Sequence, residues 1–282
     1  RHLESAFASR PATWRPLVYC WRGGKRSGAM AHVLREVGWR AAALAGGYQS
    51  YRRAVLAELD ALPAGFAFRV VCGPTGSGKS ALLAALAAQG AQVLDLEGLA
   101  RHRGSVLGDL PGDPQPSQKM FDSLLWQALR GLQRARPVFV EAESRRIGSV
   151  QLPTPLLERM RASPCLRLEP AAAERVKFLV GEYRHLIAQP ELLRRKLEQL
   201  SSLQPREVMA RWMECIAAGA WEELVGDLLE RHYDPLYRRS LGRNYAGSVD
   251  APILRPDSLE PAGLEASAAQ ILARREEPVL AG

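Results

Sequence analysis

The sequence predicts an α/β protein in which a parallel-sheet domain is preceded by a smaller α/β unit and followed by a helical region. Three observations predict this class. Apolar strand segments alternate with helical segments over residues 17–168, a glycine-rich loop follows one of the strands, and residues 171–232 show helical periodicity alone. Strands that alternate with helices form a parallel sheet, and ligands bind at the carboxyl ends of its strands.

The first unit is predicted over residues 1–62. Its predicted elements are a short buried strand at 17–20, a helix at 27–37 that ends at Gly38, a strand at 41–44 and a helix from about Gln49. Residues 61–66 contain a proline and a glycine between two patterned regions, so we predict a linker there.

The parallel-sheet domain is predicted over residues 63–170. Its predicted elements are strands at 66–72, 93–96, 138–141 and 165–168 and helices at 79–89, 117–134 and 153–162. A helical region associated with this domain follows over residues 171–250, with breaks at Pro190 and Pro205, and residues 251–282 are predicted to form a loose tail.

Composition limits the classes of partner. The chain has 38 Lys and Arg against 30 Asp and Glu, a net charge of +8, which favours a polyanionic partner over a membrane. No apolar run approaches the roughly 20 residues of a membrane helix, and no signal-peptide core is present, so we expect a cytoplasmic location. The first residue is not methionine, which favours a fragment of a longer chain. The four cysteines are scattered and no histidine stands at metal-ligand spacing, so we predict neither a disulfide framework nor a zinc site.

The segment GPTGSGKS, residues 73–80, fits the phosphate-binding P-loop pattern and lies between an apolar strand and an Ala/Leu-rich helix. Its glycines allow backbone N–H groups to surround a phosphate, Lys79 supplies a positive charge, and Ser80 is a candidate Mg²⁺ ligand. The alternative is a glycine turn without a ligand. The motif predicts a phosphorylated ligand but does not specify ATP hydrolysis. The candidate phosphate-binding residues are Gly73, Thr75, Gly76, Ser77, Gly78, Lys79 and Ser80.

Two acidic pairs follow the next strands, and they are Asp95 with Glu97 and Glu141 with Glu143. A carboxylate at the end of the later strand is the usual position for holding a metal-bound water, although aspartate is more common there than glutamate. We select Asp95 and Glu141 as the site candidates. The alternative is a solvated acidic loop. The segment from residue 101 to 119 is long for a simple connection, which favours either a substrate loop or a disordered surface excursion.

Cys20 is the candidate nucleophile. It ends a strand, is followed by a glycine-containing loop that opens a helix, and has three cations within six residues, all of which favour the thiolate. The alternative is a structural cysteine, which we predict for Cys72, Cys165 and Cys215 because they lie in apolar strands or on a helix.

These residues together resemble a known family. YCWRGGKRSGAMAHVL with LAGGYQSYR is similar to the active-site half of a rhodanese domain, and its combination with GPTGSGKS, DLEGLARHRGS and VFVEAESRRIG resembles bacterial tRNA 2-selenouridine synthase over roughly residues 14–240. The resemblance implies a partial rhodanese-like unit, because only about 16 residues precede Leu17 and the first half of such a domain is missing.

The resemblance also implies an activity. The family exchanges sulfur for selenium on wobble 2-thiouridine of certain tRNAs, with selenophosphate and geranyl diphosphate as substrates and an S-geranylated tRNA as intermediate. Cys20 matches the family's catalytic cysteine, and the P-loop would hold the diphosphate, with Mg²⁺ as a candidate cofactor. Candidate contacts to tRNA or diphosphate are Arg101, Arg103, Arg145 and Arg146.

Two other classes of function fit the residues alone. One is a small-molecule kinase with Mg²⁺-ATP in the P-loop and Asp95 as the base that activates the substrate. The other is a nucleotide-dependent RNA-binding module in which Cys20 has no chemical role. Labelled prenyl transfer separates the selenouridine synthase from both, and ATP turnover identifies the kinase.

Overall fold

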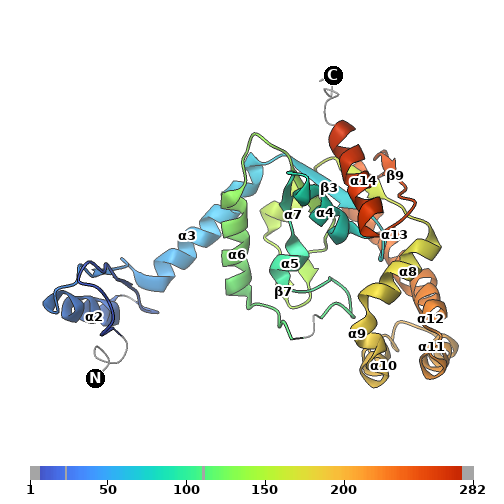
Figure 1. Cartoon of the computed structure of the whole chain (residues 1–282), viewed down its shortest axis with the longest axis horizontal. Coiled ribbons are helices and arrows are strands. Elements are labelled where there is room, and N and C mark those ends of the chain that lie inside the picture. Colours follow the sequence, from blue (N-terminus) through green and yellow to red (C-terminus); the bar gives the residue numbers. More distant parts are fainter. Residues whose placement is uncertain (1–6, 23, 110–111, 275–282) are drawn as a thin grey trace. The chain divides into compact units, whose positions relative to one another are not determined.

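The structure is a computed structural model that describes residues 7–22, 24–109 and 112–274. It consists of two compact units, residues 1–58 and 59–282, which we call the N-terminal unit and the P-loop unit (Figure 1). No helix among the described residues is both long enough and apolar enough to cross a membrane.

The N-terminal unit is a two-stranded parallel sheet with helices. Its elements are β1 (Leu17–Val18), α2 (Lys25–Glu36), β2 (Ala42–Ala43) and the first part of α3 (Gly47–Ala61). This order of strand and helix is the predicted one. The core is small, with Ala31, Leu34 and Ala41 at its centre and Trp39 packed against them.

The prediction that residues 17–20 form a buried strand is wrong. The regular strand has only two residues, and Leu17 and Tyr19 are 61% and 62% exposed. A sheet of two strands cannot enclose both faces, so apolar residues of β1 remain at the surface.

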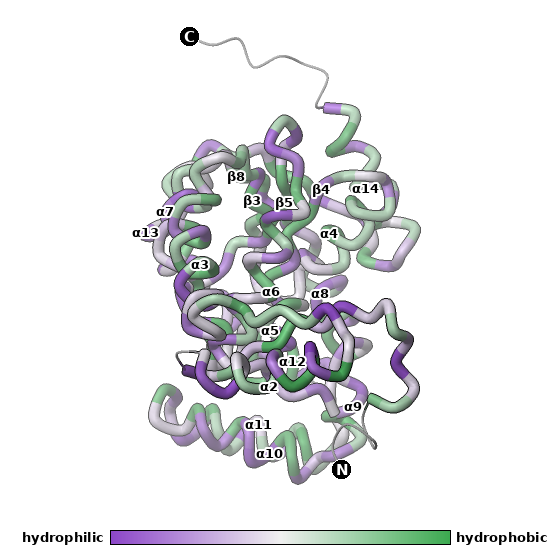
Figure 2. Tube along the Cα trace, turned by 90° about the vertical axis from the view of Figure 1, so that its left-hand side faces the viewer, coloured by the Kyte–Doolittle hydropathy of each residue, from purple (hydrophilic) through white to green (hydrophobic). Residues whose placement is uncertain are grey.

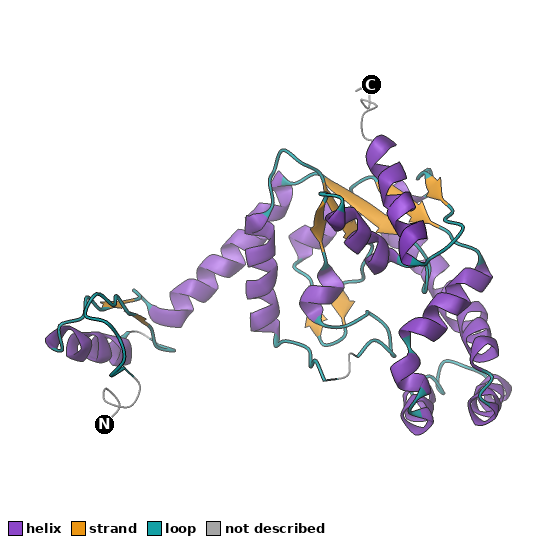
Figure 3. Ribbon diagram, in the orientation of Figure 1, coloured by secondary structure: helices purple, strands orange, loops and turns teal. Residues whose placement is uncertain are grey.

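The P-loop unit contains a five-stranded parallel sheet, which confirms the predicted α/β class. The strand order is β4 (Gln92–Leu94), β5 (Val138–Glu141), β3 (Phe68–Cys72), β8 (Cys165–Leu168) and β9 (Ile253–Leu254), and every pair is parallel. The strands lie side by side in Figure 3, and the apolar residues of β3 and β5 are coloured green in Figure 2. The central strand β3 is buried at four of its five residues, as expected for a strand covered on both faces.

Helices cover this sheet. The helices between β3 and β8 in the chain are α4 (Lys79–Ala88), α5 (Leu96–Ala100), α6 (Gln118–Gly131) and α7 (Thr154–Arg161). Two short elements were not predicted, namely α5 and the hairpin formed by β6 (Arg146–Ile147) and β7 (Val150–Gln151). The predicted linker forms a 3₁₀ turn, η1 (Leu62–Gly65), with Pro63 buried.

The helical region belongs to the same compact unit. Its elements are α8 (Ala172–Glu182), α9 (Arg184–Ile187), α10 (Pro190–Glu198), α11 (Arg206–Ala218), α12 (Trp221–Leu228), a π-helical turn η2 (Leu229–Tyr233), α13 (Asp234–Asn244) and a 3₁₀ turn η3 (Ala246–Ser248). Pro190 begins α10 and Pro205 caps α11, as the predicted breaks require. The fully buried Trp212 is at the centre of the helical core, and its indole N–H donates to Asp227 at 2.8 Å.

The prediction of a loose tail over residues 251–282 is wrong for its described part. β9 joins the sheet beside β8, and α14 (Pro261–Ala273) packs on α4 through Leu264 and Ala268 (Figure 1). Both helices are rich in alanine, which allows their backbones to approach closely. Residues 275–282 lie outside the described part of the chain.

Candidate functional site

The glycine-rich loop lies between β3 and the first turn of α4, in the strand–loop–helix context that the motif predicts. Gly76 and Gly78 have φ angles of 77° and 78°, which residues with side chains rarely adopt. A Cβ on Gly73 would lie 2.8 Å from the carbonyl oxygen of Leu168. The loop therefore requires glycine at these three positions.

Two polar groups of the loop are available to an anion. Lys79 Nζ donates to the carbonyl oxygen of Gly73 at 2.9 Å, so its ammonium group lies against the loop. The hydroxyl of Ser77 is fully buried and has no hydrogen-bond partner in the described structure. Since a buried hydroxyl without a partner is costly, a phosphate oxygen at the loop would satisfy it.

Three carboxylates gather beside Ser80. The Ser80 hydroxyl donates to Glu97 at 2.9 Å and lies 3.3 Å from Glu141, and carboxylate oxygens of Glu97, Glu141 and Glu143 lie within 4.8 Å of one another. Burial raises the pKa of Glu141 well above its usual range, and the neighbouring Glu97 and Glu143 add to this rise. Burial, followed by the charge of Glu97, raises the pKa of Glu143 to about 8.

This carboxylate group fits a hard divalent cation such as Mg²⁺, because all of its donor atoms are oxygens. One oxygen of Glu141 is buried and has no hydrogen-bond partner among the described residues. A bound cation would give that oxygen a partner and would neutralise the repulsion among the three carboxylates. Glu97, Glu141, Glu143 and Ser80 are the residues that would hold it.

Asp95, which we selected from the sequence, is not one of these three carboxylates, but its charge contributes to the raised pKa values of Glu97 and Glu141. It caps α5, and its carboxylate accepts a hydrogen bond from the N–H of Gly98 at 2.8 Å. Glu97, two residues later in that helix, takes the position beside Ser80. The choice between the two depends on α5, a five-residue helix that the sequence pattern does not distinguish from a loop.

Of the four candidate arginines, Arg103 lines the pocket above the P-loop. Its guanidinium forms an ion pair with Glu182 at 2.9 Å and lies over the ring of Tyr183. The other three have different surroundings. Arg101 pairs with Asp113, Arg146 donates to the carbonyl oxygen of Gly148 within the β6–β7 hairpin, and Arg145 is exposed on the loop before that hairpin.

The pocket above the P-loop has a volume of about 240 Å³. One side is formed by the loop, Lys79 and Ser80, and the other by Phe178 and Leu179 of α8 and by Tyr183, which directly follows this helix. The sequence does not single out Phe178, Leu179 or Tyr183. Nothing in their spacing distinguishes them from ordinary core positions of a helix.

A second, apolar pocket adjoins the first. The two pockets share the lining residues Thr75, Ser105, Leu179 and Tyr183. The remaining lining of the second pocket is almost entirely apolar and comes from the loop after α5 and from α8, α9, α10, α12 and η2. Those residues are Leu107, Val180, Leu186, Ile187, Leu193, Trp221, Leu224, Val225, Leu228, Leu229 and Tyr233.

A buried arginine fixes the P-loop to the helical region. Arg175 on α8 donates two hydrogen bonds to the carbonyl oxygen of Thr75, at 3.0 and 2.8 Å. The same guanidinium pairs with Asp234 of α13 at 2.6 Å. Gly76 meets the next turn of α8, where an added Cβ would lie 2.6 Å from Leu179. These contacts align the phosphate pocket with the apolar pocket.

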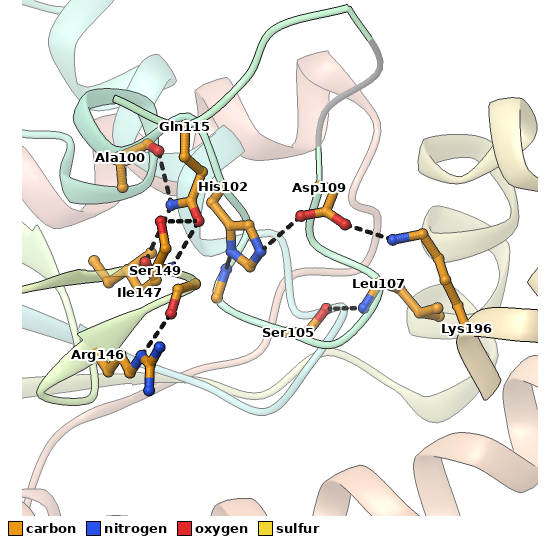
Figure 4. A network of polar contacts seen from close by, with 12 residues as sticks. Ala100, His102, Ser105, Leu107, Asp109, Gln115, Arg146, Ile147, Ser149 and Lys196 are labelled. Carbon is orange, nitrogen blue, oxygen red and sulfur yellow. Dashed lines mark hydrogen bonds and ion pairs between the residues drawn. The ribbon is translucent and has the colours of Figure 1, made fainter. Parts of the chain in front are cut away.

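The loop that includes Arg103 and Ser105 is held by a polar network (Figure 4). The buried His102 accepts from the N–H of Gly104 at 3.0 Å through Nδ1, so its Nε2–H faces Asp109 at 3.3 Å. Asp109 in turn accepts from Lys196 of α10 at 2.6 Å. Burial lowers the pKa of His102, in agreement with a neutral ring. Residues 101–109 are therefore an ordered part of the pocket wall.

Cys20 lies in the N-terminal unit and is partly exposed, whereas the other three cysteines are buried. The Ser27 hydroxyl lies 3.4 Å from its sulfur, and this hydrogen bond is the largest cause that lowers the pKa of Cys20 to about 7. Backbone N–H groups at the start of α2 act in the same direction. The geometry gives a thiolate-forming cysteine, which is what a nucleophile needs.

Comparison with known proteins gives the family. The model of the tRNA 2-selenouridine synthase AAA domain matches residues 66–215. The chain belongs to the tRNA 2-selenouridine synthase family. Proteins named tRNA 2-selenouridine synthase from Alcanivorax borkumensis, Bdellovibrio bacteriovorus and Nitrosomonas europaea are 33%, 31% and 35% identical to it. The alignments cover 82%, 84% and 69% of this chain and 70%, 74% and 52% of those relatives.

The family match covers a defined part of the candidate site. Residues 66–215 include the P-loop, the three carboxylates and α8, so these features belong to the AAA domain of the selenouridine synthase family. Cys20 lies outside this match. Its role remains a prediction from its geometry and from the rhodanese resemblance.

Proposed function

We propose that this selenouridine synthase family member is a transferase that replaces sulfur by selenium in wobble 2-thiouridine of tRNA. The reaction passes through an S-geranylated intermediate, with geranyl diphosphate and selenophosphate as donors. Membership of the family supports the tRNA substrate and the selenouridine product. The donors and the intermediate rest on the pockets and on the sequence resemblance.

The observation that supports a prenyl diphosphate is the junction of two pockets of opposite character. The P-loop pocket is lined by Lys79, Arg103 and Ser80, which suit a diphosphate. The lining of the apolar pocket, which shares four residues with the first, suits a hydrocarbon chain, and because its volume is only about 50 Å³, its side chains would have to move apart to admit a geranyl group. A nucleotide fits this junction poorly, because a base buried in the apolar pocket would leave its polar edge without hydrogen-bond partners.

The residues suggest a division of the two chemical steps. In the first, the tRNA sulfur attacks the first carbon of the prenyl chain, the C–O bond to diphosphate breaks, and Lys79 and Arg103 stabilise the negative charge on the leaving diphosphate. A divalent cation held by the carboxylate group beside Ser80 would add positive charge at the same place. In the second step, the Cys20 thiolate takes the phosphoryl group of selenophosphate and thereby frees selenide. Selenide attacks the carbon that bears the geranylated sulfur, the C–S bond breaks and geranylthiol leaves, and water then releases phosphate from the cysteine.

The experiment is a transfer assay with labelled geranyl diphosphate and a short stem–loop RNA that contains one 2-thiouridine. Lys79→Ala should reduce prenyl transfer by at least about 100-fold, because it removes a charge that acts on the leaving group, while RNA binding stays unchanged. Lys177→Ala is the matched control, since this lysine is exposed on α8 and pairs with Glu260.

Cys20→Ser separates the second step from the first. The variant should accumulate geranylated RNA and form no selenouridine, as measured by mass spectrometry of the nucleosides. Normal selenouridine formation by this variant would refute the role of Cys20. Micromolar binding of ATP in calorimetry, without binding of geranyl diphosphate by the folded protein, would favour the kinase alternative.

A further inference from the structure

Two stacked aromatic rings lie beside Cys20. Trp21 follows the cysteine in the chain and Tyr48 is in the first turn of α3, and their ring centroids are 4.6 Å apart with planes inclined by 7°. Tyr51, one turn further along α3, is 5.9 Å from Tyr48. Trp21 remains 54% exposed, so about half of its surface is accessible to solvent.

The backbone fixes this pair relative to the cysteine. The N–H of Tyr48 donates to the carbonyl oxygen of Cys20 at 3.0 Å. The preceding Gly47 has a φ angle of 60°, and a Cβ there would lie 2.5 Å from the same oxygen. The start of α3 is therefore held directly against Cys20, and the stacked pair has a fixed position next to the nucleophilic sulfur.

The charge of the chain is concentrated in the same unit. Residues 1–58 contain ten Lys and Arg against three Asp and Glu, which gives +7 of the total net charge of +8. The exposed cations closest in sequence to the cysteine are Arg22, Lys25 and Arg26. A polyanion is attracted to this unit, whereas the remaining 224 residues contribute only +1.

We propose that Trp21, supported by Tyr48, is a stacking platform for one unpaired nucleobase of an RNA, with the cations of the N-terminal unit holding the adjacent phosphates. Aromatic side chains surrounded by Lys and Arg are the usual way in which proteins hold unstacked bases. Charged residues are depleted at the core of protein–protein interfaces, whereas this surface is strongly basic. The base that stacks here would lie beside Cys20, and its identity as 2-thiouridine rests on the proposed function.

The test is a binding cycle with the full chain. Fluorescence anisotropy gives the Kd of a short stem–loop RNA with one 2-thiouridine in its loop, and of the same RNA with an abasic residue at that position. No donor substrate is present, so binding is measured without turnover. The proteins are the wild type, Trp21→Ala, Trp21→Phe and Val37→Ala, where Val37 is an exposed apolar residue of the same unit and serves as the control.

Removing the base should weaken binding to the wild type and to Val37→Ala by about 5- to 150-fold, the range for one stacked base. It should have little effect on Trp21→Ala, which has lost the platform, and Trp21→Phe should restore most of the difference. The alkylation rate of Cys20 shows that each variant is folded around the cysteine. If removal of the base weakens RNA binding equally for the wild type and for Trp21→Ala, the stacking role of Trp21 is refuted.

The result is independent of the transfer chemistry. If the stacking energy is found and no selenium transfer occurs, the platform stands and the proposed function fails. If transfer occurs and the base contributes equally to binding in all variants, the function stands and the platform is refuted. Tight binding of the abasic RNA to every protein would show that the unit recognises phosphates alone, which also refutes the platform.

Discussion

The hydrogen bond from Ser27 to the Cys20 sulfur predicts a measurable change in reactivity. Ser27→Ala removes the largest cause that lowers the thiol pKa from 9.0 to about 7. The backbone N–H groups at the start of α2 remain, so a full return to 9.0 is the upper limit of the change. At pH 7 the thiolate fraction would then fall from about one half to about one hundredth.

This loss is partly offset because a more basic thiolate is a better nucleophile. With a Brønsted coefficient of about 0.4–0.5, two pKa units increase the intrinsic rate about 6- to 10-fold. The net prediction at pH 7 is that Ser27→Ala reacts at most about five- to eightfold more slowly than the wild type. Above roughly pH 8–8.5 the order reverses, because the greater nucleophilicity of the variant's thiolate then outweighs its smaller ionised fraction.

Alkylation by iodoacetamide from pH 5.5 to 10 measures this directly. Cys20→Ser gives the background from the three buried cysteines, and Ser50→Ala, a serine of α3 in the same unit, is the matched control. A pH profile of Ser27→Ala that coincides with the wild type would refute the assignment of the low pKa to this hydroxyl.

Two further predictions concern the P-loop unit. Arg175→Ala should lower the free energy of unfolding by about 3 kcal/mol in urea titrations, because the Asp234 carboxylate loses its partner, whereas Lys177→Ala should have little effect. Similar losses of unfolding free energy in both variants would contradict a stabilising role of the Arg175 contacts with Thr75 and Asp234. Glu141→Gln should raise the thermal midpoint at pH 8. The pKa of Glu141 is raised in the folded state, so the folded wild type loses stability as the pH rises above the pKa that this carboxyl has in the unfolded chain. Mg²⁺ should stabilise the wild type and not this variant, and equal stabilisation of both would place the cation elsewhere.

The P-loop could be predicted because its residues are required locally. Positive φ angles demand glycine at Gly76 and Gly78, and the lysine and the serine follow at fixed spacing. The starts of α10 and α11 were predictable for the same kind of reason, since proline restricts the backbone wherever it occurs. Local requirements of this kind are visible in the sequence without knowledge of the rest of the fold.

Features that depend on distant segments could not be predicted. Arg175 bonds to Thr75, which lies 100 positions before it in the chain, and to Asp234, which lies 59 positions after it. Nothing in the sequence indicates that this arginine is buried. The packing of α14 on α4 likewise depends on where the chain returns after α13, and an Ala-rich segment at the end of a sequence resembles a frayed helix. Glu97 and not Asp95 bonds to Ser80 because of one short helix, α5, that the sequence did not predict.

The positive charge of the N-terminal unit is expected to affect both chemical steps through RNA binding. Because the N-terminal unit has +7 of the +8 charges, the electrostatic part of RNA binding is expected there, including for the prenyl transfer that uses the P-loop unit. Raising the salt concentration should therefore weaken RNA binding and reduce geranylation and selenation with the same dependence on the logarithm of salt, at subsaturating RNA. A geranylation rate that resists salt while selenation falls would show that the P-loop unit binds RNA by itself. In that case cations of the P-loop unit, such as Lys79 and Arg103 in the pocket, and not the N-terminal unit, would determine how RNA reaches the first step.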